Sequence, residues 1–158
     1  LRELTNFGFN SERNIASIGT NAKMQEINAA IGIRQLEGFN DRLSSRRSSL
    51  SEYKRLLSPL GYGFQANDDL STVPFVSAIA PTSETAQNVL NVLQESSIEA
   101  RKYYYPLHEE EVIAQNSTLA STFNITKDIY SRIISLPLHD GMDKKDISAI
   151  VELMKAGA

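Results

Sequence analysis

The stretch Thr72–Glu84, TVPFVSAIAPTSE, contains the change of hydrophobic pattern that decides the fold class. Residues 72–80 are rich in β-branched and apolar side chains, which favour a strand. Pro81 ends that pattern, and hydroxyl residues followed by Glu84 are typical of a helix N-terminus, where a hydroxyl caps free N–H groups and an acid faces the positive end of the helix dipole. A strand followed directly by a helix predicts a domain that mixes sheet and helix.

The segments after this stretch continue the alternation of elements. In chain order they predict a helix ending near Leu93, an aromatic strand over Glu99–Tyr105, a helix over Asp128–Ser135, an extended piece over Leu136–Leu138 and a helix over Lys144–Lys155. The inward face of the last helix carries Ile147, Ile150, Val151 and Met154, at helical spacing. A β-α-β unit with further elements predicts an α/β (α+β two-layer) domain, a small sheet with helices packed on one face.

Residues 23–57 predict one long amphipathic helix, because apolar residues recur there at spacings of three, four or seven. At the usual rise per residue such a helix is about 50 Å long, so it must bend or connect two bodies. Gly32 and Gly38 are expected to mark close packing or a kink, since a glycine inside a helix costs up to about 1 kcal/mol.

The chain is therefore expected to have three parts. Residues 1–22 mix Asn, Gly and Ser with isolated apolar residues and predict an ordered loop. Residues 23–57 form the connecting helix, and residues 58–158 form the small C-terminal α/β domain, after a Pro and two glycines that end the helix.

Composition excludes several classes of function. A chain of 158 residues, 41% hydrophobic and 22% charged, suits a soluble globular protein with one ordinary core. Its net charge of −3 gives no general attraction to nucleic acid or to anionic membranes, and no stretch resembles a membrane span or a secretory signal. The absence of cysteine excludes disulfides and thiolate chemistry, and the two histidines lie far apart in sequence, which disfavours a metal site.

No standard catalytic motif is present: the sequence has neither Gly-x-Ser-x-Gly nor Gly-x-Gly-x-x-Gly nor a Walker loop. One polar cluster is Asn21 with Lys23, where a loop meets a predicted helix start. An amide, an ammonium and free helix N–H groups suit a phosphate or a carboxylate. Alternatively, Asn21 caps the helix and Lys23 is solvated.

A second polar cluster is Arg101–His108, RKYYYPLH. Strand alternation places Arg101, Tyr103 and Tyr105 on one side and Lys102 and Tyr104 on the other. Aromatic faces, phenol hydroxyls and cations suit a sugar or a nucleotide, whereas a purely structural interpretation has the tyrosines fill a sheet edge with their hydroxyls in water.

Four blocks occur together in the order and spacing of one known family: NFGF at 6–9, GTNAKMQEINAAIGIRQLE at 19–37, ARKYYYPLH at 100–108 and ISLPLHDGM at 134–142. The chain resembles the C-terminal part of a DegT/StrS-type nucleotide-sugar aminotransferase that depends on pyridoxal 5'-phosphate. The resemblance implies the aspartate-aminotransferase fold, a cytoplasmic homodimer, and transfer of an amino group, usually from glutamate, onto a keto sugar nucleotide in surface polysaccharide or deoxyaminosugar biosynthesis.

The resemblance also implies roles for single residues. Asn21 matches the residue that reaches the cofactor phosphate of the neighbouring subunit, and Lys23 occupies a position that is often Arg and faces the same cavity. Lys102 and Tyr103 match a His-Tyr pair that lines the sugar site, with Lys in place of the His. His108 ends the third block, where a substrate contact and a structural hydrogen bond remain equal alternatives.

In the family, the lysine that holds the cofactor covalently and the acid facing its pyridine nitrogen lie upstream of the NFGF block. Because neither is in this chain, we expect the chain alone not to transaminate, and Lys23 is not that lysine. The N-terminal large domain of a parent enzyme is the implied partner, and residues around 24–35, which it would cover, should be apolar and exposed. Two alternatives are a non-catalytic dimerisation or interaction module and a stand-alone sugar-nucleotide binding domain that uses residues 101–105.

Overall fold

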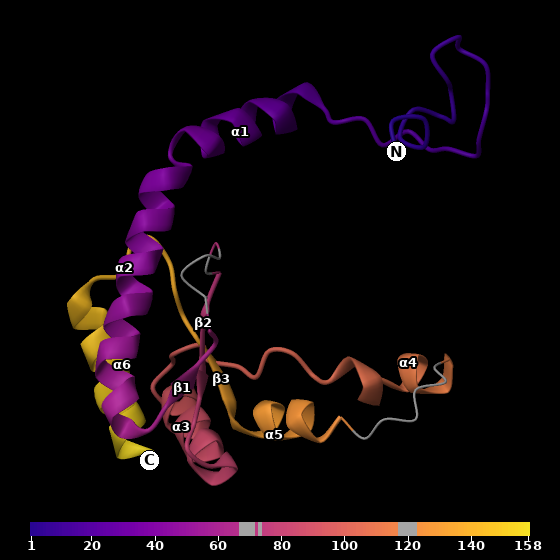
Figure 1. Ribbon diagram of the computed structural model, residues 1–158. Coiled ribbons are helices and arrows are strands. Elements are labelled where there is room, and N and C mark those ends of the chain that lie inside the picture. Colours follow the sequence, from indigo (N-terminus) through magenta and orange to yellow (C-terminus); the bar gives the residue numbers. More distant parts are fainter. Residues whose placement is uncertain (67–71, 73, 117–122) are drawn as a thin grey trace. The chain divides into compact units, whose positions relative to one another are not determined.

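The computed structural model describes residues 1–66, 72, 74–116 and 123–158 (Figure 1). They form two compact units, an N-terminal unit of residues 1–40 and a C-terminal unit of residues 41–158. The elements are α1 (Glu26–Glu37), α2 (Phe39–Leu57), the 3-10 turn η1 (Ser58–Leu60), β1 (Gly63–Phe64), β2 (Val76–Ile79), α3 (Ser83–Glu95), the 3-10 turn η3 (Leu107–Glu109), α4 (Glu111–Asn116), α5 (Asn124–Arg132), β3 (Ile133–Leu136) and α6 (Lys144–Ala156).

The range predicted as one helix contains two. α1 begins at Glu26, three residues after the predicted start, and Gly38 separates it from α2 with φ −96° and ψ 8°. The predicted interruption therefore lies at Gly38. At Gly32 the helix is regular, and a Cβ built there has no described atom within 4 Å, so no close packing explains this glycine.

None of the twelve residues of α1, all of which the structure describes, is buried. Its large apolar side chains are exposed, with Ile27 at 66% and Leu36 at 70%. At 100° per residue, Ile27 and Ile31 lie on one side of the helix and Ile33 and Leu36 on another, so α1 is apolar on two sides. The expectation of an apolar, exposed surface around residues 24–35 is confirmed.

The C-terminal unit contains a three-stranded antiparallel sheet in the order β1-β2-β3. Gly63 of β1 pairs with Ile79, and along β2 and β3 the register runs from Val76↔Leu136 to Ile79↔Ile133. β2 is the central part of the strand predicted over residues 72–80, of which Val73 lies outside the described residues. The pattern analysis did not predict β1.

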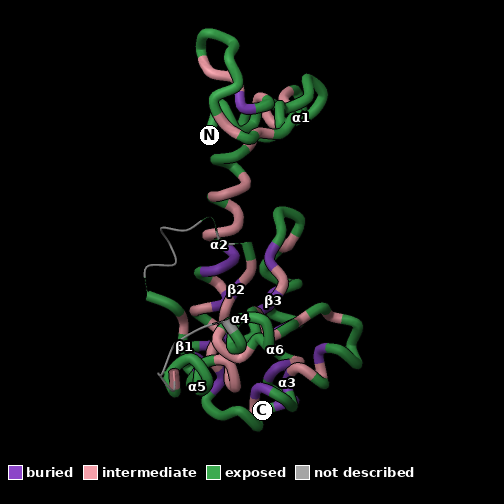
Figure 2. Tube along the Cα trace, turned by 90° about the vertical axis from the view of Figure 1, so that its right-hand side faces the viewer, coloured by how far each residue is buried: buried purple, intermediate pink, exposed green. Residues whose placement is uncertain are grey.

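Helices cover one face of this sheet. Val76 and Ala78 of β2 and Ile134 and Leu136 of β3 are buried, as alternate residues on one face must be. The buried hydrophobic residues that share this core are Leu50, Tyr53, Leu57, Tyr62, Ala80, Ala86, Val89, Leu93, Leu138, Ile147, Ile150, Val151 and Met154. They come largely from α2, α3 and α6 (Figure 2). The predicted two-layer arrangement, including the inward face of the last helix, is confirmed.

The C-terminal half of α2 belongs to this core, because Leu50, Tyr53 and Leu57 are buried. The Tyr53 hydroxyl donates a hydrogen bond to the carbonyl oxygen of Pro137 at 3.2 Å. Burial raises the pKa of this phenol, with a smaller contribution from the negative charge of Asp146. α2 is thereby joined to the chain just beyond β3.

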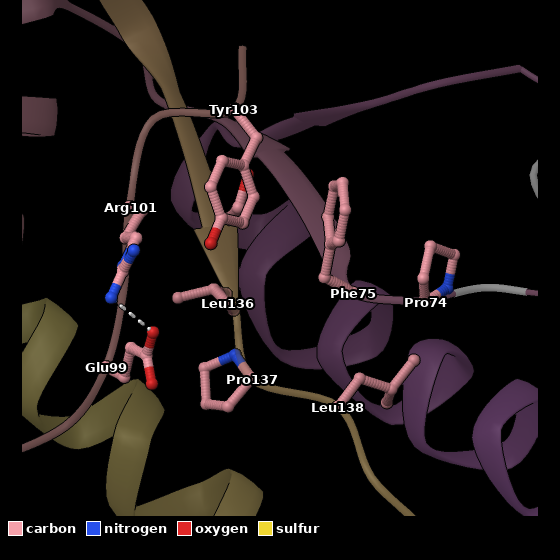
Figure 3. Close-up of a pocket in the computed structure, with 9 residues that line it drawn as sticks. Pro74, Phe75, Glu99, Arg101, Tyr103, Leu136, Pro137 and Leu138 are labelled. Carbon is pink, nitrogen blue, oxygen red and sulfur yellow. Dashed lines mark ion pairs between the residues drawn. The ribbon is translucent and has the colours of Figure 1, made fainter.

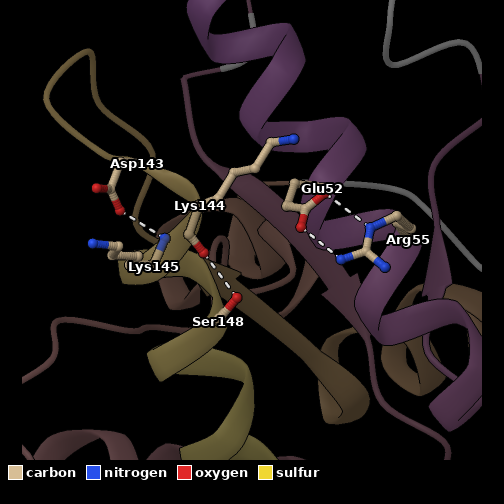
Figure 4. Close-up of polar contacts among 6 residues, drawn as sticks. All are labelled: Glu52, Arg55, Asp143, Lys144, Lys145 and Ser148. Atoms are coloured by element: carbon tan, nitrogen blue, oxygen red, sulfur yellow. Dashed lines mark hydrogen bonds and ion pairs between the residues drawn. The ribbon is translucent and has the colours of Figure 1, made fainter.

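Side-chain caps fix where α3 and α6 begin. The Thr82 hydroxyl accepts from the Thr85 N–H at 3.0 Å, which confirms the predicted hydroxyl cap. At α6, the Asp143 carboxylate accepts from the Lys145 N–H (Figure 4) and from the Asp146 N–H. The Asp146 side chain accepts in turn from the Asp143 N–H, which completes a capping box. Such caps contribute about 1 kcal/mol each.

Two predicted elements are wrong. Glu99–Tyr105 is not a strand, since only Arg101 pairs there, in an isolated bridge with Ser135. The helix predicted over Asp128–Ser135 is α5, which begins at Asn124 and ends at Arg132, and the remaining residues belong to β3. The pair Ile133–Ile134 is β-branched and finds a strand partner in β2, so tertiary pairing overrides the helical pattern.

We predict that Leu57→Ala destabilises the C-terminal unit by about 2–5 kcal/mol, because it removes buried methyl groups and leaves a cavity. Leu36→Ala in α1 is the matched control: this leucine is 70% exposed, so the same deletion should change the free energy of unfolding by less than about 0.5 kcal/mol. Urea titration followed by circular dichroism measures both. Equal losses would contradict the assignment of the core.

Alkaline pH should weaken the fold through Tyr53. Its folded pKa is raised above the value of about 10 in an unfolded chain, so its contribution is complete below pH 10 and is lost as the pH rises further. In Tyr53→Phe the loss of unfolding free energy above pH 10 should be smaller, at a cost of about 1 kcal/mol at pH 7 for the missing hydrogen bond. Tyr104→Phe, at a tyrosine that is 72% exposed, is the control and should retain the alkaline loss.

Candidate functional site

The N-terminal loop brings the first two motif blocks together. Asn6 and Asn21 form an antiparallel bridge, and the Phe7 N–H donates to the Thr20 carbonyl at 3.1 Å. NFGF at 6–9 therefore lies beside the start of the GTNAKM block, although nine residues separate the two blocks in sequence.

Two glycines allow this close approach. A Cβ on Gly8 would lie 1.8 Å from the carbonyl oxygen of Ser17, and Gly8 has a φ of +81°, which other residues rarely adopt. A Cβ on Gly19 would lie 2.2 Å from the backbone nitrogen of Gly8. The loop can therefore take this path only with glycine at both positions.

Asn21 is held by its backbone while its side chain is exposed. Helix α1 starts at Glu26 with Gln25 as its N-cap, so the alternative in which Asn21 caps the helix is wrong. For the same reason the free N–H groups of α1 begin several residues beyond Asn21. Any anion at Asn21 would be bound by its carboxamide and neighbouring loop groups.

Lys23 lies next to the NFGF block. Its Nζ is 5.2 Å from the centroid of the Phe7 ring, a cation–π contact worth about 0.5–1 kcal/mol at an exposed site. The ammonium still has its hydrogen-bonding capacity, because a ring face takes none of its three N–H donors. The N-terminal unit thus presents an amide at Asn21 and a cation at Lys23 from one glycine-fixed loop.

The tyrosine segment is attached to the sheet at one point. The Arg101 N–H donates to the Ser135 carbonyl at 3.2 Å, and the Ser135 N–H donates to the Arg101 carbonyl at 2.7 Å. Because β3 is antiparallel both to β2 and to this segment, the segment runs parallel to β2 with β3 between them. The second strand of the predicted β-α-β unit is therefore reduced to this single bridge.

The predicted alternation of side chains holds for Arg101 and Tyr103, which line the same cavity, and is wrong beyond them. Tyr104 stacks on Tyr103, with ring centroids 4.9 Å apart, and Tyr105 packs edge-to-face against Tyr130 at 5.5 Å. The ladder ends at Arg101, so ring packing and not strand pairing sets these directions.

Lys102 contacts a different part of the unit from Tyr103. Its Nζ donates to the Ser131 carbonyl at 3.0 Å, in a partly buried position, and lies 5.9 Å from the Tyr130 ring centroid. Through this hydrogen bond, Lys102 connects the tyrosine segment to the end of α5. Neighbours in sequence, Lys102 and Tyr103 are not brought to one point.

A cavity of about 210 Å³ lies beside Tyr103 (Figure 3). Its walls are Pro74, Phe75, Glu99, Arg101, Tyr103, Ser135, Leu136, Pro137 and Leu138. The Phe75 and Tyr103 rings touch, with centroids 5.3 Å apart, and Arg101 donates to the Glu99 carboxylate at 2.8 Å. Both partners of this ion pair are well exposed, so water screens it.

Ser135, like Glu99, is a polar cavity residue that the sequence pattern did not indicate. It is 4% exposed, and its hydroxyl oxygen is buried with no hydrogen-bond partner among the described residues. Ile134 and Leu136 face the helices, so Ser135 faces the other side of the sheet. A single serine between buried aliphatic residues is a usable signal only if IISL at 133–136 is recognised as a strand.

His108 lies in the turn η3, with its ring 4.5 Å from that of Phe123. Its Nε2 is buried and has no hydrogen-bond partner among the described residues. Next to it, the Lys127 ammonium is 2.6 Å from the Glu109 carboxylate and lowers the pKa of that carboxyl group. This ion pair ties η3 to α5.

Arg42, Arg46 and Arg55 of α2 form ion pairs within the C-terminal unit. Arg46 donates to Asp140 at 3.0 Å, with Arg42 3.8 Å from the same carboxylate, and Arg55 pairs with Glu52 at 2.7 Å (Figure 4). The Arg55 hydrogen bond lowers the pKa of Glu52. These contacts favour a solvated, paired face over a docking surface for phosphate.

Within residues 1–66, 72, 74–116 and 123–158, no helix has the length and apolar character needed to cross a membrane. The same part of the chain contains no group of three or more His, Cys, Asp or Glu side chains able to hold a metal ion.

The sequence pattern of the DegT/DnrJ/EryC1/StrS aminotransferase family matches residues 1–155, which include all four motif blocks. The chain belongs to this family. Protein Rv3402c of Mycobacterium tuberculosis H37Rv is 39% identical over 149 residues, covering 92% of this chain and 36% of the relative. A dTDP-4-amino-4,6-dideoxy-D-glucose transaminase of Shigella dysenteriae is 30% identical over 159 residues, covering 96% and 43%.

Solved structures agree with this family membership. A protein of Bacillus cereus ATCC 10987 described as a PLP-dependent aminotransferase superposes with a TM-score of 0.83 at 30% identity, over 98% of this chain and 43% of the other. The chain thus spans about two fifths of the length of the DegT/DnrJ/EryC1/StrS family relatives it matches.

We predict that Gly8→Ala opens the N-terminal loop, because the new methyl group would meet the Ser17 carbonyl oxygen and strain a backbone at positive φ. Limited proteolysis should then cut within residues 1–22 at least tenfold faster. Gly32→Ala is the control: its methyl group meets open space in α1 and should slow cutting or leave it unchanged. Unchanged cutting in both variants would contradict the close approach at Gly8.

Proposed function

We propose that this chain is the C-terminal part of a pyridoxal-phosphate-dependent aminotransferase that aminates a keto sugar attached to a nucleotide. The observation that carries the proposal is the family match over residues 1–155. The name of the Shigella dysenteriae relative, a dTDP-4-amino-4,6-dideoxy-D-glucose transaminase, supports a nucleotide-linked sugar as substrate. Glutamate is the proposed amino donor, and surface polysaccharide or deoxyaminosugar biosynthesis is the proposed setting.

The N-terminal loop suits the proposed cofactor. A carboxamide N–H donor is a good phosphate ligand, and Asn21 presents one, exposed, from a backbone that the bridge to Asn6 holds in place. We assign Asn21 to the cofactor phosphate of the neighbouring subunit in a homodimer. Lys23 supplies a positive charge from the same loop and is assigned to the substrate side of the cavity.

The tyrosine segment supplies the proposed contacts to the sugar nucleotide. Tyr103 lines the cavity of the C-terminal unit and offers a ring face and a hydroxyl. Lys102 holds the segment in place through the Ser131 carbonyl and adds positive charge near it. His108 has a buried Nε2 without a partner among the described residues, so it remains a proposed substrate contact.

When bound, pyridoxal phosphate supplies the electron sink for the transfer of the amino group. The residues of this chain would bind the phosphate and orient the sugar. The lysine that holds the cofactor and the acid at its ring nitrogen are assigned to the N-terminal large domain of the parent enzyme. The chain alone is therefore proposed to be inactive.

A second candidate is a non-catalytic dimerisation or interaction module that keeps the small-domain fold. The exposed apolar residues on two sides of α1 favour it, since such a helix is normally covered on both sides. The parent-enzyme proposal accounts for the same surface by coverage from the large domain and a second subunit. The two differ in cofactor binding, which the module would lack.

The test uses a longer polypeptide that also contains the residues encoded upstream of residue 1. It should show a pyridoxal absorbance band and glutamate-dependent amination of a keto sugar nucleotide. Asn21→Ala should weaken cofactor binding about 10- to 100-fold, the effect expected for one hydrogen bond to a charged group. Asn91→Ala, at an exposed asparagine on α3, is the control and should leave affinity unchanged. A longer polypeptide that binds no pyridoxal phosphate would refute the proposal and favour the module.

A further inference from the structure

We propose that the cavity beside Tyr103 binds the base of the nucleotide and is selective for uracil or thymine. The inference rests on the proposed function, since it names the part of the substrate that this cavity takes. The cavity lies on the face of the sheet opposite the helices, where Ser135 and the segment through Arg101 lie side by side.

The size of the cavity favours a single ring. At about 210 Å³ it is smaller than the sites of roughly 300–1,000 Å³ that enclose drug-sized ligands. A six-membered pyrimidine ring fits such a space, whereas the fused rings of a purine would leave part of their apolar surface in water. Phe75 and Tyr103 form an aromatic wall against which a flat ring can pack (Figure 3).

The surface of the cavity also favours a base over a sugar. Phe75, Pro137 and Leu138 make much of its wall apolar. A hexose would bring several hydroxyl groups into contact with this wall, and each buried hydroxyl needs a hydrogen-bond partner. A pyrimidine has two apolar faces and confines its polar groups to its edge, so fewer partners are needed.

The polar groups match one particular edge. Uracil and thymine present an acceptor, an N–H donor and an acceptor along O4, N3 and O2. Ser135 and Arg101 provide donors, and Glu99 provides an acceptor, all lining the same cavity. In the structure Arg101 bonds to Glu99 in a well-exposed pair, which costs little to rearrange.

Ser135 gives the strongest reason to expect a ligand. Its hydroxyl is buried and has no partner among the described residues, although buried hydroxyls are normally paired. Arg101 pairs with Ser135 across the backbone bridge, and its side chain is well exposed beside the same cavity. A base carbonyl would then supply the missing acceptor.

The experiment titrates the 158-residue chain with nucleoside monophosphates and follows backbone amide shifts by NMR. dTMP and UMP should bind and shift the amides of Ser135 and Tyr103. GMP, which has a purine, and glucose 1-phosphate, which has a phosphate and a sugar but no base, should bind at least tenfold more weakly. Equal affinity for dTMP and either of these two compounds would overturn the proposal.

Two variants locate the contacts. Ser135→Ala should weaken dTMP binding at least fivefold, whereas Ser77→Ala, at the cross-strand partner of Ser135 on β2, should not. Glu99 is exposed, so Glu99→Ala should fold normally. It should weaken dTMP binding and abolish the preference for dTMP over its N3-methyl analogue, which lacks the N–H donor. An N3-methyl analogue that binds the original chain as well as dTMP does would overturn the assignment of Glu99 and the proposal with it.

These results separate this inference from the proposed function. If the longer polypeptide binds pyridoxal phosphate and aminates its substrate while the chain ignores dTMP, only the base site is wrong. If the chain binds dTMP selectively while the longer polypeptide binds no cofactor, the base site stands and the aminotransferase assignment fails.

Discussion

Burial of the apolar face that the sheet shares with α2, α3 and α6 is the constraint on which the rest of the C-terminal unit depends. One hydrogen bond within this core runs from the Tyr53 hydroxyl to the Pro137 carbonyl. It joins α2 to the chain as it leaves β3. Since Pro137 and Leu138 also line the cavity beside Tyr103, the same contact fixes one wall of the proposed base site. Core packing and site geometry are thus determined together, and burial raises the pKa of the phenol above its ordinary value.

Because side chains alternate along each strand, one face of the sheet contributes to the core and the opposite face lines the proposed binding cavity. In β3, Ile134 and Leu136 face the helices and contribute to the core, while Ser135 faces the other side. The uncovered side then receives Arg101 across the bridge, with Glu99 and Tyr103 two residues away in each direction. Two-residue periodicity therefore aligns three side chains of an irregular segment along one cavity, even though only one residue of that segment is paired.

Patterns that depend on local physics were predictable from the sequence. The Thr82 cap, the inward face of α6 and the interruption at Gly38 follow from hydrogen-bonding capacity, helical period and glycine propensity. Features that depend on a distant partner were not. IISL at 133–136 forms a strand because it pairs with β2. Residues 99–105 do not form a strand, because only Arg101 pairs with a neighbour. Ser135 was missed because its position in a strand depends on this pairing with β2.

The same distinction applies to Asn21. The motif named the residue, but its position before a predicted helix was also compatible with a capping role. The structure decides against the cap through the start of α1 at Glu26, which leaves Asn21 held by the bridge to Asn6 with an exposed amide. Gly8 and Gly19 maintain this arrangement by permitting contacts that no side chain would allow. The loop is held in one conformation although the adjoining helix α1 has no buried residue. Binding of groups from outside the chain explains this conformation better than the stability of the N-terminal unit does.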